Sequence, residues 1–396
     1  MNFDQVRQAP YRDRRQERDE PRMNRLRAAT DRFEEWYRTD ALPLWARAAA
    51  DRTGAFYEQL DFNGGPVTGT PRRVRVQSRQ IHSFTRAALA GWLPEGDAIA
   101  DRGFRRLLET ACPDNAARGC AHLVDDDGRI IDATRDLYDQ AFLILAAASR
   151  ILAGDDTARE IAERTLAFID SELGSEHGGH LENDRRSLPR RQNPHMHLFE
   201  ATMALYAATG DPAHLARARS VETLFNTRFL DRNAGVLREF FADDWSLDPQ
   251  TGDRIEPGHM VEWAFLLDRF EALSGEDRSE EKNLLHYAAR SMTAPDDAPF
   301  LPNSARLGAE PARRARRLWP QTEALKAALV LGRDEEAADL IDAMFGSYLN
   351  QETSGLWCDE YDAEGRPTAK AAPASILYHL HEAVSCAVER RHKLNP

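Results

Sequence analysis

The chain has 396 residues, of which 42% are hydrophobic and 30% are charged, enough to bury a large core. Its formal net charge of −13 argues against nucleic acid or an anionic membrane as the main partner. No apolar run resembles a signal-peptide core or approaches a membrane span, so we expect a cytoplasmic protein.

The four cysteines, Cys112, Cys120, Cys358 and Cys386, show no C-x-x-C pair and no zinc-ligand spacing. We therefore expect reduced, buried thiols.

The N-terminal segment, residues 1–28, is charged and poor in aliphatic residues, which predicts a flexible extension. Residues 29–396 are expected to form a single domain. Its first helix is predicted to begin near Thr30 and to continue to Trp45. The Gly- and Pro-containing segment 61–71, with the β-like residues 73–76 beside it, is predicted to be a loop or a short hairpin.

Further along, the chain repeats itself. Apolar helices end in a glycine followed closely by an aspartate at intervals of 56 to 65 residues, at Gly96, Gly154, Gly210, Gly275 and Gly332. Each is followed by a second, more charged amphipathic helix. A final helix over 374–390 supplies a sixth unit. This period is right for a helical hairpin with loops, so the sequence predicts an all-α protein of six hairpins.

Two features favour closure of these hairpins into a double ring. One helix of each pair is apolar nearly all round, as expected for an inner ring. Polar or aromatic residues also recur near the beginning of each inner helix: Arg79, Asp139, His197, His259, Trp319 and His379. In a closed ring, all these helix N-termini and their partial positive charges face one mouth. The sequence therefore predicts a pocket there.

The predicted pocket combines histidines with aromatic, amide and carboxylate side chains. Its candidate members are Arg79, Tyr138, Asp139, Asn193, His197, His259, Glu262, Trp319, Gln321, Glu323 and His379. Aromatic and amide groups suit a sugar-like ligand, and imidazoles suit proton transfer near neutral pH. No nucleotide-binding glycine motif and no obvious Ser or Cys nucleophile is present.

Each element of the pocket has a second interpretation. The His-x-x-Glu pairs His197/Glu200, His259/Glu262 and His379/Glu382 place both side chains on one helix face, as metal ligands require. Each Glu could equally orient its own imidazole, and we expect neither a metal nor another cofactor. A lone histidine on an inner helix is usually structural, and Trp319 could equally belong to the core.

Two further groups lie near the predicted pocket. His195 and His381 are offset by two residues from the neighbouring histidines, so we expect them to be structural. The basic run 313–317 is usually a solvated face, although it could reach a phosphate on the substrate.

The sequence resembles the N-acylglucosamine 2-epimerase superfamily, whose members are (α/α)6 barrels. The matching blocks are D-L-Y-D-Q-A-F (136–142), R-Q-N-P-H-M-H-L-F-E-A (191–201), E-P-G-H-M-V-E-W (256–263), R-L-W-P-Q-T-E (317–323) and P-A-S-I-L-Y-H (373–379). Within the superfamily they look most like the bacterial mannose isomerases and the mannose-6-phosphate isomerase-like proteins.

The resemblance implies roles for individual residues. The family's catalytic histidine pair falls on His259 and His379, and its glutamate after the first of these falls on Glu262. The histidine of the N-P-H-M-H helix falls on His197, and the barrel-mouth arginine on Arg79. Tyr138, Asn193 and Trp319 match positions that line the sugar site.

These roles lead to a mechanistic hypothesis, metal-independent interconversion of D-mannose and D-fructose by a monomer or homodimer. His259, assisted by Glu262, opens the sugar ring. His379 moves a proton from C2 to C1 through a cis-enediol, while Arg79 and His197 stabilise the oxyanion. Activity is then expected to fall on acidification near pH 6.5. The alternatives are a sugar 2-epimerase, a mannose-6-phosphate isomerase and a sugar-binding or protein-binding scaffold without activity.

Overall fold

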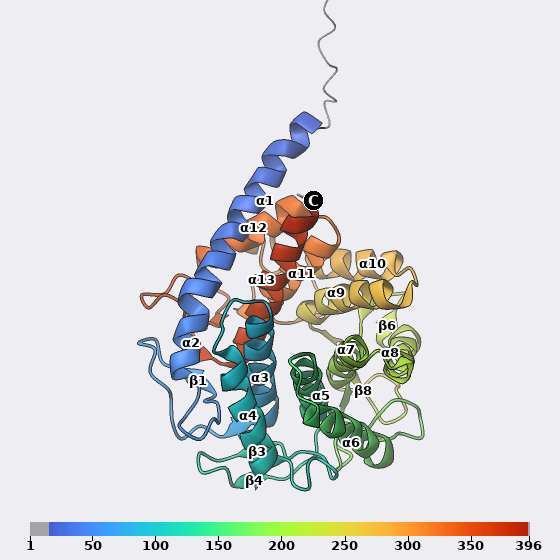
Figure 1. Ribbon diagram of the computed structural model, residues 1–396. Helices are drawn as coiled ribbons and strands as arrows, with labels where there is room; N and C mark the ends of the chain where they lie inside the picture. The colour runs from blue at the N-terminus through green and yellow to red at the C-terminus, as the bar shows by residue number, and fades with distance from the viewer. Residues whose placement is uncertain (1–15, 395–396) are drawn as a thin grey trace, which may run out of the picture.

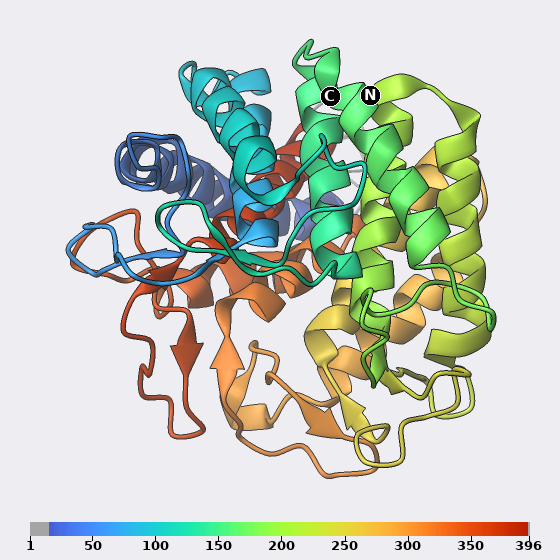
Figure 2. The ribbon, with the colours of Figure 1, turned by 90° about the horizontal axis from the view of Figure 1, so that it is seen from below.

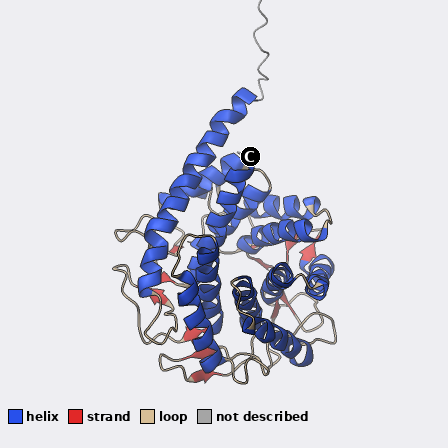
Figure 3. Ribbon diagram, viewed as in Figure 1, coloured by secondary structure: helices blue, strands red, loops and turns tan. Residues whose placement is uncertain are grey.

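The computed structural model describes residues 16–394, and its helices form two concentric rings (Figures 1 and 3). Each inner helix contacts the next, and the last contacts the first, so the inner ring is closed. The inner helices are α3 (Val74–Leu89), α5 (Leu137–Leu152), α7 (Gln192–Thr209), α9 (Pro257–Ser274), α11 (Leu318–Val330) and α13 (Ser375–Leu394). The predicted all-α (α/α)6 barrel is confirmed.

The outer ring contains the helices with more exposed residues. Five of them each pack against the inner helix that precedes them in the chain: α4 (Gly96–Ala111), α6 (Thr157–Glu172), α8 (Pro212–Leu224), α10 (Ser279–Ser291) and α12 (Asp334–Phe345). The sixth outer place belongs to α1 (Gln16–Trp36), which packs against α12 and α13 (Figure 1). The two ends of the chain thus complete the last hairpin together.

Helix α1 corrects the predicted N-terminal boundary. It begins at Gln16 rather than near Thr30, so part of the predicted extension belongs to the barrel. Leu26 is buried, and Arg25 forms ion pairs with Asp339 (2.7 Å) and Asp342 (2.9 Å) of α12. Residues 1–15, also predicted to be flexible, lie outside the described residues. After α1 the chain continues through η1 (Tyr37–Ala41) and α2 (Leu42–Ala48).

Short antiparallel strands connect the helices at one end of the barrel (Figure 2). The strand pairs are β1 (Gln59–Leu60) with β13 (Ala372–Pro373), β2 (Arg72–Arg73) with β3 (Leu123–Val124), β3 with β4 (Ile130–Asp132), β5 (Arg190–Arg191) with β8 (Phe240–Phe241), β6 (Leu230–Asp231) with β7 (Val236–Leu237), β9 (Arg254–Ile255) with β10 (Ala305–Arg306), and β11 (Arg316–Arg317) with β12 (Glu360–Tyr361). Two short helical turns, η2 (Phe225–Phe229) and η3 (Pro295–Asp297), complete the described elements. Of the β-like residues 73–76, only Arg73 is in a strand, and the rest begin α3.

Three inner helices are fastened to the preceding loop in the same way. The fourth residue of each helix is a buried glutamine whose amide both donates to and accepts from one backbone unit: Gln77 with Phe56, Gln140 with Cys120, and Gln321 with Leu301, at 2.7–2.9 Å. Satisfying buried backbone groups in this way fixes where each loop meets its helix.

Four of the five predicted glycine stops are confirmed. Gly154, Gly210, Gly275 and Gly332 have φ between +70° and +91°, a backbone conformation that glycine tolerates best. The first inner helix is an exception, because Gly91 (φ +71°) follows it, whereas Gly96 is the first residue of α4.

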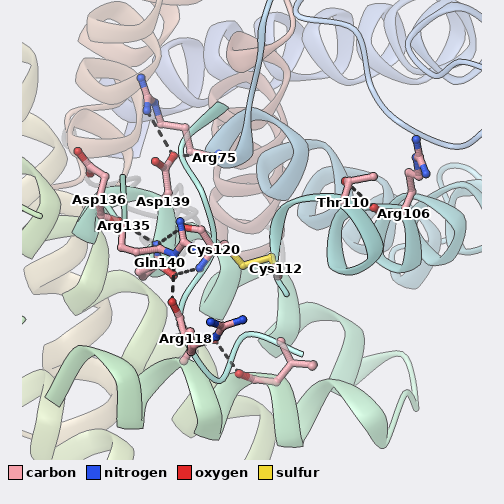
Figure 4. The surroundings of a disulfide bond; sticks show 12 residues. Arg75, Arg106, Thr110, Cys112, Arg118, Cys120, Arg135, Asp136, Asp139 and Gln140 are labelled. Atoms are coloured by element: carbon pink, nitrogen blue, oxygen red, sulfur yellow. Dashed lines mark hydrogen bonds and ion pairs between the residues drawn. A yellow bond between two sulfur atoms is a disulfide. The ribbon is translucent and has the colours of Figure 1, made fainter. Parts of the chain in front are cut away.

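The cysteine prediction is half wrong. Cys112 and Cys120 form a disulfide that joins the end of α4 to the loop before α5 (Figure 4). The loop returns so that their Cα atoms are 4.2 Å apart, a proximity that their spacing in the sequence did not indicate. Cys358 and Cys386 are free and buried, as predicted. Among residues 16–394, no helix is long and apolar enough to cross a membrane.

Candidate active site

A cavity of about 210 Å³ opens at the mouth of the barrel, where the N-terminal ends of the inner helices meet. Eight of the predicted residues line it: Arg79, Tyr138, Asn193, His197, His259, Glu262, Trp319 and His379. The lining is completed by Arg73, Arg75, Glu256, Arg317, Ser375 and Ile376. All six inner helices contribute a side chain, so their partial positive charges converge on this space.

His259 is held by carboxylates from outside its own predicted pair. Its Nδ1 lies 3.0 Å from Glu239 and 3.5 Å from Glu256. Burial alone would lower the pKa of this imidazole, but Glu239, aided by Glu256 and Glu262, raises the pKa to about 10. His259 is therefore an imidazolium at neutral pH and can donate a proton.

Glu239 is itself fixed by a chain of hydrogen bonds that leads into the core. Gln192 donates to Glu239 (2.9 Å) and accepts from the indole N–H of Trp263 (2.7 Å). Trp263 is fully buried and stacks between the rings of Phe225 and Phe199. The orientation of His259 is thus fixed, through Glu239 and Gln192, by the packed indole of Trp263.

His379 has the opposite electrostatic environment. Its Nδ1 lies 2.7 Å from Glu323 Oε1, which leaves Nε2 as the ring nitrogen available to a substrate. Burial lowers the pKa of His379 well below its usual value, and the positive charges of Arg79 and Lys326 lower it further. His379 is therefore a neutral imidazole near neutral pH and can accept a proton.

His197 is also neutral, which changes the role expected for it. Its Nδ1 lies 2.9 Å from Glu200, and burial lowers the pKa of the ring to about 4 despite that carboxylate. If Nδ1 carries the ring proton toward Glu200, Nε2 is an acceptor. This arrangement suits a hydrogen bond from a sugar hydroxyl better than the oxyanion stabilisation first expected of His197.

Glu262 faces the cavity. Burial, together with the nearby carboxylate of Glu323, raises the pKa of Glu262 well above its usual value. The shift favours the protonated form, in which the carboxyl group can donate a hydrogen bond to a ligand oxygen.

Trp319 lies between the two catalytic candidates. Its ring centroid is 5.0 Å from that of His259 and 5.9 Å from that of His379. Gly258 makes room for the indole, because a Cβ at this position would lie 2.5 Å from the Trp319 ring. The exposed indole face offers an apolar surface on which the C–H groups of a sugar ring can pack.

Arg79 differs from the other arginines of the cavity. Arg73, Arg75 and Arg317 form ion pairs with Glu58 (2.7 Å), Asp139 (3.3 Å) and Asp359 (2.8 Å), respectively. Arg79 instead donates to the hydroxyl of Tyr138 (2.9 Å) and lies over the Phe142 ring at 4.2 Å. No carboxylate neutralises it among the described contacts, so its charge is available to an anion in the cavity.

Three predicted substrate-binding residues do not line the cavity. Asp139 is fully buried and accepts from Arg75 and His122, the latter at 2.6 Å (Figure 4 shows Arg75 and Asp139). Gln321 fastens the loop at Leu301, and Glu323 lies behind His379. Gln321 is two residues from Trp319, which turns it to another side of the helix.

The predicted His-x-x-Glu pairing holds only for His197 and Glu200. His259 and His379 pair with Glu239 and Glu323, and Glu382 bonds to His82 at 3.0 Å. His195 and His381 are buried with partners of their own, the backbone N–H of His180 and the hydroxyl of Tyr37. Their structural role is consistent with the sequence prediction.

Glu262, Glu323 and His379 bring their donor atoms within 4.8 Å of one another, close enough to suggest a cation. The protein itself supplies a cation next to these three residues, because the ammonium of Lys326 lies 2.6 Å from Glu323 Oε2. A metal ion would be repelled by that fixed charge, so the donor set does not fit a metal.

Several supporting residues escaped the sequence analysis for identifiable reasons. Glu239 lies in a loop outside the inner helices, where helical phase gives no signal. Lys326 follows Glu323 by three residues on the same helix, a spacing that could have been noticed. From the basic run 313–317, only Arg317 reaches the cavity, since Arg313 and Arg316 pair with Asp297.

The opposite pKa shifts of the two histidines predict a broad pH profile. His379 must be neutral to accept a proton, and its lowered pKa moves the acid limb of kcat/KM below pH 6.5, the value expected from sequence. His259 must be protonated to donate, so activity should fall again near its pKa of about 10. Measuring kcat/KM across this pH range tests the direction of both pKa shifts. An acid limb at or above pH 6.5 would contradict the environment assigned to His379.

The architecture defines the class of protein, an (α/α)6 barrel with two histidines of opposite pKa shift at its mouth. The chain belongs to the N-acylglucosamine 2-epimerase (GlcNAc 2-epimerase) family, whose model matches residues 54–383.

Similar proteins include a mannose-6-phosphate isomerase of Rhizobium meliloti (strain 1021), 34% identical over 87% of this chain and 93% of the relative. A D-mannose isomerase of Thermobifida fusca is 29% identical over 85% of this chain and 89% of the relative. Among solved structures, a D-mannose isomerase superposes with a TM-score of 0.80 at 22% identity, covering 90% of this chain and 97% of that one. The cellobiose 2-epimerase from Spirochaeta thermophila DSM 6192 gives 0.82 at 24% identity, covering 94% and 98%.

Proposed function

We propose that this protein is an aldose–ketose isomerase that interconverts D-mannose and D-fructose through a cis-enediol. Membership of the family makes it a sugar isomerase or epimerase. The observation that carries the finer proposal is the pair His259 and His379, which line one cavity on either side of Trp319 and have opposite pKa shifts. Two groups whose pKa values are pushed apart are suited to the roles of acid and base.

In the first step, His259 opens the pyranose. As an imidazolium it donates a proton to the ring oxygen, and the bond from C1 to the ring oxygen breaks. The neutral imidazole then takes up the proton of the anomeric hydroxyl as the C1 carbonyl forms. The carboxyl group of Glu262 and the acceptor nitrogen of His197 can hold neighbouring sugar hydroxyls. Positioned acid–base groups of this kind typically contribute about 10²–10⁴-fold in rate.

In the second step, Nε2 of His379 removes the proton from C2. The electron pair of the C–H bond forms the C1–C2 double bond, and negative charge develops on the C1 oxygen. Arg79, the arginine of the cavity without a carboxylate partner, is the donor for that charge, and the helix N-termini add to it. The proton of the C2 hydroxyl passes to the C1 oxygen. As the C2 carbonyl forms, the electron pair of the double bond takes the proton back from His379 at C1, which gives the ketose.

This account needs no metal ion, because protonated groups and Arg79 supply the positive charge. EDTA-treated protein should therefore convert D-mannose to D-fructose with unchanged kcat. The assay compares EDTA-treated and untreated protein and adds back Mg²⁺, Mn²⁺ or Zn²⁺ to a portion of each. A kcat that disappears on chelation and returns with one ion would contradict this proposal.

The rim of the cavity favours a second candidate, isomerisation of mannose 6-phosphate. Arg73, Arg75 and Arg317 stand around the mouth, and the relative from Rhizobium meliloti is named for that activity. Each rim arginine is already paired with a carboxylate, which favours the free sugar. Comparing kcat/KM for D-mannose and mannose 6-phosphate separates the two, and a preference for the phosphate would overturn the free-sugar proposal.

A further inference from the structure

A buried charged cluster lies beneath the cavity, and Lys326 is at its centre. The side chain of Lys326 is 1% exposed and does not line the cavity. Its ammonium forms a 2.6 Å ion pair with Glu323 on the same helix. The electrostatic influence of further carboxylates reaches it from three other inner helices: Glu262 of α9, Glu382 of α13 and Glu200 of α7.

Two carboxylates of the cluster have partners of their own. Glu200 accepts from His197 and from the hydroxyl of Tyr378, and Glu382 pairs with His82. Glu323 is different, because its two oxygens are divided between the site and Lys326. Oε1 contacts Nδ1 of His379 at 2.7 Å, whereas Oε2 contacts the ammonium.

We propose that Lys326 is a positioning residue that acts through Glu323 to keep Nε2 of His379 free of a proton. The inference rests on the proposed function, in which Nε2 of His379 is the base. Lysine is almost never fully buried unless it is paired, and here the pairing leads directly to the base.

The effect of Lys326 depends on where one additional proton would go. With Lys326 present, Glu323 is a carboxylate that accepts the Nδ1–H of His379, so the lone pair is on Nε2. Without it, Glu323 is left buried near other carboxylates, and the Glu323–His379 pair takes up a proton. A proton on Glu323 is donated to Nδ1 and places the ring proton on Nε2, whereas a proton on His379 makes the imidazolium. In both cases Nε2 can no longer accept.

The environment of the pair agrees with this argument. Burial raises the pKa of Glu323, and Lys326 is the main group that opposes the rise. Burial lowers the pKa of His379, and Lys326 is among the charges that lower it further. The charged and titratable groups that act on the pair are Arg79 of α3, His197 and Glu200 of α7, Glu262 of α9, Lys326 of α11, and Tyr378 and Glu382 of α13.

The test replaces Lys326 with methionine, which keeps much of the side-chain volume and removes the charge. Lys326→Met should lower kcat at pH 7 by about 10²-fold, within the range typical of a lost general base, with KM changed by less than about threefold. The acid limb of kcat/KM should move to higher pH, and activity should recover toward pH 9, where the additional proton leaves the pair.

Two further variants separate positioning from packing. In a Glu323→Gln background, Lys326→Met should have little further effect on kcat, because the carboxylate through which it acts is gone. Lys282→Met is the matched control, since Lys282 of α10 is also buried and pairs with Asp268 (2.9 Å) and Glu271 (2.8 Å), none of which lines the cavity. It should lower Tm without moving the pH profile. A Lys326→Met protein that behaves like this control would overturn the proposal.

Nitrogen-15 NMR of the histidine rings measures the protonation of Nε2 of His379 directly, without a turnover assay. In the wild-type protein Nε2 of His379 should have the shift of an unprotonated nitrogen, and in Lys326→Met that of a protonated one. A change in this signal in a protein that isomerises no sugar would support the positioning role and reject the proposed function. Isomerase activity with an unchanged Nε2 signal would reject the positioning role alone.

Discussion

Replacing His379 with alanine should reduce kcat for D-mannose by about 10²–10⁴-fold, the usual contribution of a positioned acid–base group. The variant loses the group that we propose accepts the C2 proton, while the remaining lining of the cavity is untouched. Sugar binding should therefore persist, which the fluorescence of Trp319 or calorimetry can measure. We thus expect His379→Ala to lower kcat without abolishing the affinity for the sugar.

His381 provides the control for that variant. It lies on the same helix, is equally buried and contacts the hydroxyl of Tyr37 at 3.0 Å, away from the cavity. His381→Gln should lower Tm and leave kcat essentially unchanged. If His379→Ala instead kept its kcat and only weakened sugar binding, the barrel would be a binding scaffold rather than an enzyme.

Replacing His259 with glutamine should cost a similar factor, about 10²–10⁴-fold in kcat/KM for the cyclic sugar. The amide can still donate a hydrogen bond toward Glu239, but it has no proton to transfer to the ring oxygen. The alkaline limb of the pH profile, which reports loss of the His259 proton near pH 10, should disappear with it.

A graded version of this experiment uses Glu239→Gln. Glu239 is the main group that raises the pKa of His259, so without it burial prevails and the pKa falls. The alkaline limb should move to lower pH while kcat on its acid side stays largely intact. An alkaline limb that does not move in this variant would show that the limb belongs to another group.

The ring architecture could be predicted because it depends on local, repeated signals. Glycines in the left-handed conformation follow five of the six inner helices, and polar or aromatic residues recur within the first two turns of each. The sixth outer helix could not be found in this way. Its place is taken by α1, whose charged sequence resembles an extension and whose partner α13 lies at the other end of the chain.

The cavity lining was predictable for the same reason, whereas the hydrogen-bond partners were not. Helical phase places His379 and Glu382 on one face, but Glu323 of α11 and His82 of α3 are nearer partners for them. Such choices depend on which neighbouring helix brings a side chain within 3 Å. The contact of Glu239 with His259 and the Cys112–Cys120 disulfide both depend on how loops fold. The sequence of a loop has no helical periodicity from which such contacts could be predicted.

The most direct test of the account is the fate of the C2 proton. EDTA-treated protein would be incubated with D-mannose in D₂O and the products followed by NMR. We expect D-fructose as the first product, with deuterium at C1 to the extent that the proton held on His379 exchanges with solvent before it returns. D-Glucose with deuterium at C2 as the first product would contradict the isomerase proposal.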